Sequence, residues 1–137
     1  MVDAILNSKL SLIKSKDIAV NAKATVPAEL RISEIDLCAI IGNLLDIALE
    51  ACLRQSENEE RFIRVYIGIL KKQLYICVTN SVGGAVKKVG KTYLSTKDEH
   101  THGFGLIRID RLAEKYGGYV NRQNEEGAFA TEVMLPL

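Results

Sequence analysis

The sequence has no excess of either charge and no long hydrophobic run. It holds 18 Lys and Arg residues against 17 Asp and Glu residues, a formal net charge of +1 over 137 residues. This balance excludes the strong positive field that attracts nucleic acids, so no nucleic-acid partner is expected. The longest apolar run without a charge, 37–45, is too short to cross a bilayer. A basic segment followed by an apolar one, as in a signal peptide, is also missing.

Cysteine is scarce, and its spacing argues against disulfides. The three cysteines are Cys38, Cys52 and Cys77, an odd number without a Cys-x-x-Cys pair. Cys38 and Cys52 fall on one expected helix, separated by about 21 Å of helical rise, which is beyond disulfide reach. Free thiols and a reducing, cytoplasmic setting are therefore expected.

The composition is that of a globular domain. Apolar residues make up 47% and charged residues 26% of the chain, whereas disorder requires low hydrophobicity and high net charge. Periodicity predicts helices at 2–16, 34–54 and from Gly103 to Gly117, and strands at 18–26, 62–70, 74–79, 119–124 and 128–135. Ser33 is the expected N-cap of the second helix, with Asp36 completing a capping box.

This order of elements predicts an α+β fold. Successive short strands favour a mixed, mostly antiparallel sheet, with the two longer helices covering one face in a two-layer sandwich. Residues 55–61 are expected to form a solvated, charged loop. Residues 80–102, rich in Gly and Lys, are expected to form a long irregular loop, a length that is usually functional.

Three segments carry residues suited to ligand chemistry. Gly103-Phe104-Gly105-Leu106 lies where a loop enters a helix, and backbone N–H groups at such a junction favour anions. A Gly-x-Gly pair by itself is more often a plain loop–helix turn. The lysines before it, with Ser95-Thr96-Lys97, suit a polyphosphate or form a solvated loop.

The second and third segments are polar residues on a helix and at a strand end. Asn43, Asp46 and Glu50 share one stripe of the second helix, as a solvated back face or as the wall of a ligand cleft. Asn80 ends a strand, where an amide can read a nucleobase edge or form a simple Asx turn.

Together, in this order and at these separations, the segments resemble the GHKL ATPase superfamily. Within it, they are most similar to the ATP-binding catalytic domain of sensor histidine kinases of the peptide-pheromone and citrate type. Residues 42–51 resemble the N box, 78–84 the adenine-reading box, and 95–106 the ATP lid with its His-Gly-x-Gly-Leu box. The resemblance covers residues 18–137, and 3–10 resemble the segment that precedes the domain.

The resemblance implies an α/β sandwich that holds ATP between the second helix and the lid. Asn80 stands where the family usually has an adenine-binding Asp, and its amide oxygen can accept the same bond. The remaining nucleotide-binding residues implied by the resemblance are Asn43, Lys97, His102, Gly103, Gly105, Leu106 and Thr131. Asn43 is also implied as the catalytic residue and as the ligand of Mg²⁺.

Ile47 departs from the family pattern. The position four residues after Asn43 usually holds a second Asn that binds Mg²⁺, and isoleucine has no oxygen to offer. Asn43 itself stands where the hydrolysing branches carry a Glu base, and an amide cannot activate water. Phosphoryl transfer is therefore expected rather than hydrolysis.

The implied function is transfer of the ATP γ-phosphate to a histidine on a separate dimerisation domain, and from there to a response regulator. Residues 1–16 would be the end of a helical linker from that missing domain, and 17–137 the catalytic domain of a membrane-anchored homodimer. The chain's two histidines, His100 and His102, fall in the lid. The chain alone is thus not expected to phosphorylate itself.

Two alternatives follow from the same residues. A serine kinase of the anti-sigma type has similar length, but its Asn-Ala and Asp-x-Gly-x-Gly signatures are absent here. A degenerate nucleotide-binding or protein-interaction module with an impaired Mg²⁺ site is supported by Ile47.

Overall fold

The structure is a computed structural model that describes residues 1–56, 58–83, 88–89, 92–93 and 99–137. The described helices are α1 (Val2–Lys14), α2 (Glu34–Leu53) and α3 (Glu99–Lys115). The main strands are β1 (Ala19–Ala24), β2 (Phe62–Leu70), β3 (Gln73–Ser81), β6 (Tyr119–Glu125) and β7 (Ala128–Pro136).

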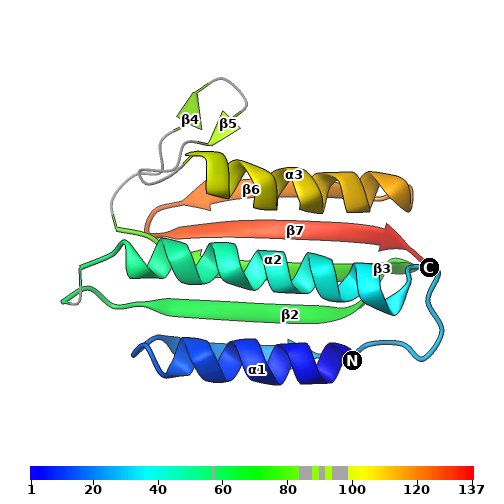
Figure 1. Cartoon of the computed structure of the whole chain (residues 1–137), viewed down its shortest axis with the longest axis horizontal. Helices are drawn as coiled ribbons and strands as arrows, with labels where there is room; N and C mark the ends of the chain where they lie inside the picture. The colour runs from blue at the N-terminus through cyan, green and yellow to red at the C-terminus, as the bar shows by residue number, and fades with distance from the viewer. Residues whose placement is uncertain (57, 84–87, 90–91, 94–98) are drawn as a thin grey trace.

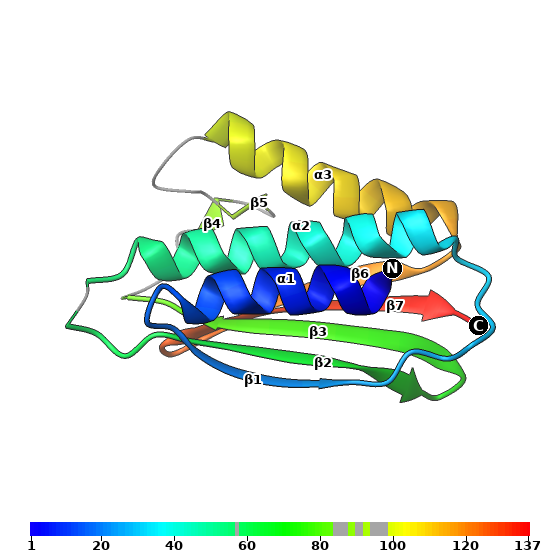
Figure 2. The same ribbon diagram turned by 60° about the horizontal axis from the view of Figure 1, so that its bottom comes forward.

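These five strands form one mixed sheet in the order β1-β2-β3-β7-β6. β1 runs parallel to β2, and the other neighbouring pairs are antiparallel. The helices α1, α2 and α3 lie side by side on one face of the sheet (Figures 1 and 2). The predicted α+β two-layer sandwich is therefore confirmed.

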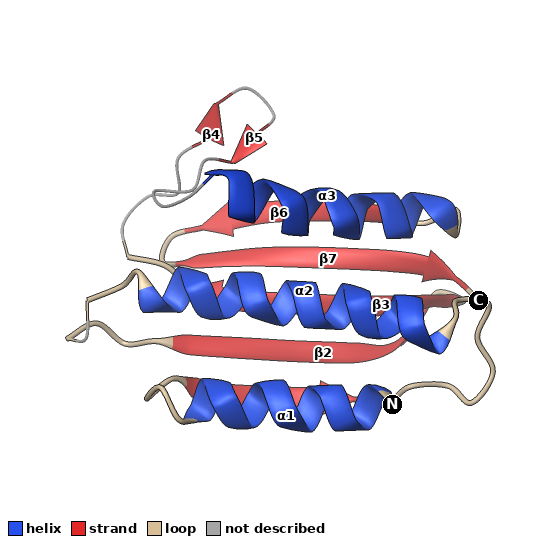
Figure 3. Cartoon of the chain, in the orientation of Figure 1, coloured by secondary structure: helices blue, strands red, loops and turns tan. Residues whose placement is uncertain are grey.

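The two longer helices cover one face as predicted, and α1 adds to that layer, because it lies beside α2 and buries Val2, Leu6 and Ile13 in the same core (Figure 3). One expectation about the chain between β3 and α3 was wrong in detail. The stretch 80–102 is not irregular throughout. It contains a short antiparallel pair, β4 (Lys88–Val89) with β5 (Thr92–Tyr93), and α3 begins at Glu99 rather than at Gly103.

The core lies between the sheet and the helices, and it is formed by residues that repeat at strand spacing and at helix spacing. Alternate residues of each strand point toward the helices, and residues three and four apart on α2 point toward the sheet. The largest fully buried side chains come from the three helices and from β2, β3 and β7: Ile13, Leu37, Ile40, Ile41, Leu45, Ile63, Ile67, Leu74, Ile76, Ile109, Leu135 and Val133. Most of the listed side chains that belong to helices come from α2, which is the central helix of the helical layer.

The start of α2 is tied to the end of α3. The Ser33 hydroxyl accepts a bond from the Asp36 backbone N–H at 3.1 Å, which confirms the predicted N-cap. In the predicted capping box, the Asp36 side chain would accept a bond from the Ser33 N–H. In the structure, the Tyr116 hydroxyl links these two groups instead. The Ser33 N–H donates to the Tyr116 hydroxyl at 3.3 Å, and that hydroxyl donates to the Asp36 carboxylate. Lys115 also binds this carboxylate, and the two bonds lower the pKa of Asp36.

The cysteines are free thiols, and Cys38 and Cys52 are both buried on α2. Burial raises the pKa of both thiols, so they stay protonated near neutral pH. Among the described residues, no helix combines the length and apolar character that spanning a bilayer would need.

The turn between β2 and β3 gives a first testable prediction. Lys71 and Lys72 both have positive φ, 51° and 63°, in a two-residue hairpin turn of the kind that favours Asn-Gly. Replacing the pair by Lys71→Asn with Lys72→Gly is expected to raise the free energy of unfolding by about 1 kcal/mol, because the left-handed backbone costs a lysine more. Urea unfolding followed by circular dichroism measures the change.

The control for this turn replaces both lysines with alanine. That variant removes the same two charges but keeps the left-handed strain, so no gain in unfolding free energy is expected. A gain of equal size in both variants would assign the effect to charge instead of to backbone conformation.

Candidate functional site

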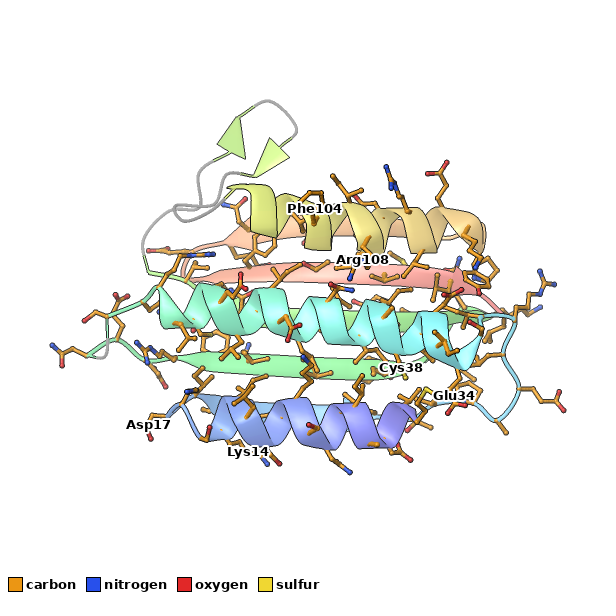
Figure 4. All side chains as sticks on the ribbon, in the orientation of Figure 1. Lys14, Asp17, Glu34, Cys38, Phe104 and Arg108 are labelled. Atoms are coloured by element: carbon orange, nitrogen blue, oxygen red, sulfur yellow. The ribbon has the colours of Figure 1, made fainter. Side chains whose placement is uncertain are left out.

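Asn43, Ile47 and Gly105 meet where α2 lies against α3. The Asn43 amide donates to the Ala39 carbonyl at 2.6 Å, which leaves the amide oxygen directed toward α3. A Cβ atom added to Gly105 would lie 3.2 Å from Ile47 Cδ1 and 3.8 Å from Asn43 Oδ1. The missing side chain at Gly105 therefore allows α3 to approach Ile47 closely, one helical turn from Asn43. Phe104, labelled in Figure 4, precedes this contact and is exposed.

The polar stripe expected on α2 is divided between two neighbours. Asp46 does not face α3, because its carboxylate pairs with Lys9 Nζ of α1 at 2.7 Å. Glu50 lies near Arg54, whose pKa is lowered by burial and raised in part by that carboxylate. Since α2 lies between two helices, residues three apart on its surface contact different partners. The stripe is therefore not the wall of a single cleft, and its Asp46 carboxylate remains about half exposed, at 49%.

Asn80 and Thr131 lie on adjacent strands and point toward the helices. Their side chains are 4% and 6% exposed. Thr131 pairs with Val78, two residues from Asn80 on β3, so the two polar groups share one face of the sheet. The Asn80 amide donates to the Ser81 carbonyl at 3.0 Å, within a strand and not in an Asx turn. Its oxygen receives no hydrogen bond from the described residues.

A buried polar cluster of Cys52, Gln55 and Ser81 was missed from the sequence. The Ser81 hydroxyl accepts from the Phe62 N–H at 2.9 Å and donates to Gln55 Oε1 at 2.5 Å. Cys52 Sγ lies 3.6 Å from the same hydroxyl. The solvated loop predicted for 55–61 is wrong for Gln55, which is 7% exposed. A signal was available, because Gln55 follows core residue Cys52 by three positions, the spacing that would continue the buried side of α2 into the turn after it.

The other residues predicted to bind the nucleotide are only partly described by the structure. Lys97 lies outside the described residues, and so does the side chain of His102. Gly103 and Gly105 lie inside α3, because the helix begins at Glu99. They therefore do not form the loop–helix junction expected from the sequence. Leu106 is half-buried on α3.

The side chains where α2 lies against α3, called here the α2–α3 seam, do not fit a Mg²⁺ ion held by the protein. Mg²⁺ requires octahedral coordination by oxygen. Asn43 offers one amide oxygen, Ile47 offers none, and Asp46 is engaged by Lys9. Within the described ranges, no group of three or more His, Cys, Asp or Glu side chains is placed to hold a metal. As the sequence predicts from Ile47, this contact between α2 and α3 offers too few oxygen ligands for the ion.

Comparison with known proteins agrees with the fold. A family model described as the GHKL domain matches residues 32–136. The chain is 28% identical to the sensor protein CitS of Bacillus subtilis (strain 168) over 98% of its own length, but spans only 26% of that protein.

Solved structures of histidine kinases share the fold. The catalytic domain of the histidine kinase ThkA superposes with a TM-score of 0.72 at 16% identity, covering 98% of this chain and 90% of that one. The mycobacterial sensor histidine kinase MprB gives 0.68 at 14% identity, covering 98% and 94%. The Acinetobacter baumannii histidine kinase AdeS gives 0.65 at 9% identity, covering 98% and 64%. At these identities the likeness is one of fold.

Proposed function

We propose that this chain, which belongs to the GHKL domain family, is the ATP-binding catalytic domain of a sensor histidine kinase. The observation that carries the proposal is the pair of amides, Asn80 at the sheet and Asn43 at the α2–α3 seam, each with an oxygen that the fold leaves available. The likeness to CitS and to histidine kinase catalytic domains supports it.

In the proposed complex, the nucleobase lies against the helix-facing side of β3 and β7. Asn80 accepts from the adenine amino group, and Thr131 lies beside it. Asn43 faces the phosphates. The triphosphate side is completed by Lys97, His102, Gly103, Gly105 and Leu106.

The proposed reaction is phosphoryl transfer. The bond between the γ-phosphorus and ADP breaks as a bond forms to an imidazole nitrogen of a histidine on a separate dimerisation domain, and a response regulator then receives the phosphoryl group. Asn43 is neutral and takes no proton, which favours transfer over hydrolysis. Catalysis of this kind rests on positioning and electrostatics.

The proposal extends to the whole protein. α1 would continue from the helical linker of the dimerisation domain, within a membrane-anchored homodimer whose catalytic domain lies in the cytoplasm. The burial of Val2, Leu6 and Ile13 supports a linker whose last helix packs into the core of this domain. The Lys9–Asp46 ion pair ties the same helix to α2.

Calorimetric titration with ADP tests the proposal. The wild-type chain is expected to bind ADP, and Asn80→Ala is expected to weaken binding at least about tenfold, because it removes a buried acceptor worth more than about 1 kcal/mol. Thr79→Ala is the control, since Thr79 precedes Asn80 but faces the other side of the sheet. Absence of ADP binding by the wild-type chain would contradict the proposal.

Ile47 favours a second candidate, a nucleotide-binding module without phosphotransfer. Its side chain occupies the seam beside Asn43 where a second oxygen ligand would be needed. ADP binding combined with no phosphoryl transfer to an added dimerisation domain would favour this candidate over the active kinase.

A further inference from the structure

The Asn80 amide is held in one of its two orientations. One N–H of its nitrogen donates to the Ser81 carbonyl at 3.0 Å, so the nitrogen is turned toward the backbone and the oxygen lies on the opposite side of the amide, where a ligand can donate to it. Turning the amide over would place the oxygen against that carbonyl oxygen, lose one hydrogen bond and bring two acceptors together. The Ser81 backbone thus decides whether residue 80 acts as an acceptor or as a donor.

Ser81 is itself anchored from two other elements. Its hydroxyl accepts from the Phe62 N–H at the start of β2 and donates to Gln55 just beyond α2. Arg61 in turn donates to the Gln55 carbonyl at 2.7 Å. In Figure 1 the end of α2, the start of β2 and the end of β3 meet at one end of the molecule. Ser81 is 2% exposed, so these bonds are shielded from water.

We propose that the buried Gln55–Ser81–Phe62 network sets the base specificity of the nucleotide site by holding the Asn80 amide as an acceptor. Gln55 and Ser81 are positioning residues in this proposal, which rests on the proposed function. The selected ligand is a purine with an amino group at position 6. A purine with a carbonyl oxygen there would face the Asn80 oxygen and be rejected.

The proposal predicts a dependence that a carboxylate would not show. Both oxygens of an Asp are acceptors, so its recognition of an amino group does not depend on which way it is turned. An amide needs an external bond to fix its orientation. The network should therefore matter for specificity with Asn at position 80 and cease to matter with Asp.

Calorimetric titration with ADP and GDP tests this in four proteins: wild type, Gln55→Met, Asn80→Asp and the double variant. The wild-type chain should prefer ADP. Gln55→Met should reduce that preference about five- to tenfold, the equivalent of one hydrogen bond. In the Asn80→Asp background, Gln55→Met should leave the preference unchanged. Thr79→Ala, which alters the opposite face of β3, should leave it unchanged in the wild-type background.

The possible results separate the two proposals. If wild type binds neither nucleotide, the proposed function and this inference both fail. If wild type binds ADP but Gln55→Met weakens ADP and GDP equally, or acts equally with Asn and Asp at position 80, the network is only structural and the inference alone is overturned. Ser81→Ala is the second variant should Gln55→Met not fold, and the same reduction in preference is expected from it.

Discussion

Ile47→Asn is expected to make nucleotide binding depend strongly on Mg²⁺. Residues four apart on a helix lie on the same face, so the new amide would stand beside Asn43 and facing α3, as Ile47 does now. Two amide oxygens would then converge on one ion. Mg²⁺ should strengthen binding of a non-hydrolysable ATP analogue to this variant by about tenfold or more, or about 1.4 kcal/mol. For the wild-type chain, less than about a threefold effect is expected.

The measurement is calorimetric titration of the analogue with and without Mg²⁺. Ile47→Val is the matched control, because it alters the same side chain without adding an oxygen, and its Mg²⁺ response should equal that of wild type. A strong Mg²⁺ response of the wild-type chain would show that the ion obtains its ligands elsewhere. It would also remove the structural argument for the degenerate module.

The outcome decides how the chain is interpreted within its family. If wild type ignores Mg²⁺ and Ile47→Asn gains a response, the fold retains the position of a metal site whose ligand is missing. Such a chain would bind nucleotide but would transfer the phosphoryl group poorly. ADP has fewer phosphate oxygens to hold an ion than ATP, so the contrast should be larger for the ATP analogue.

The elements of the sheet and of α2 could be predicted because their signals are local. Alternation in 62–70 and the apolar spacing around Leu44 depend only on neighbouring residues, and both elements formed as expected. The N-cap at Ser33 is local in the same sense. Its return bond through Tyr116 is not, since it joins residues far apart in the chain.

The parts of the candidate site that could not be predicted depend on packing between distant segments. Nothing near Asp46 in the sequence indicates that Lys9 will pair with it. The start of α3 was misplaced because Gly103 and Gly105 suggest a helix boundary, whereas in the fold Gly105 serves a close approach to Ile47. Gln55 was assigned to a solvated loop because its neighbours are charged, yet tertiary contacts bury it beside Ser81.

Gly118→Ala is expected to be the most destabilising single change considered for this fold. α3 ends in a Schellman arrangement, in which the Gly118 N–H donates to the Ala113 carbonyl and the Gly117 N–H to the Glu114 carbonyl. A Cβ on Gly118 would lie 2.1 Å from the Met134 carbonyl oxygen and 3.2 Å from Leu135 Cα. Both are backbone atoms of β7 held in the sheet, so neither can move aside without a large cost in free energy. A loss of about 3 kcal/mol of unfolding free energy or more is expected, at or beyond the upper end for overpacking.

Gly42→Ala supplies the control of opposite sign. Gly42 lies inside α2 with nothing within 4 Å of a Cβ atom there, so alanine should raise the unfolding free energy by about 0.5–1 kcal/mol through helix propensity. Urea unfolding of both variants, followed by circular dichroism, compares them on one scale. Opposite signs would mean that the same substitution is governed by the space between the α3–β6 turn and β7 in one case and by backbone entropy in the other. Equal small losses would contradict the close contact of Gly118 with β7, and with it the close packing of the turn that ends α3 against the sheet.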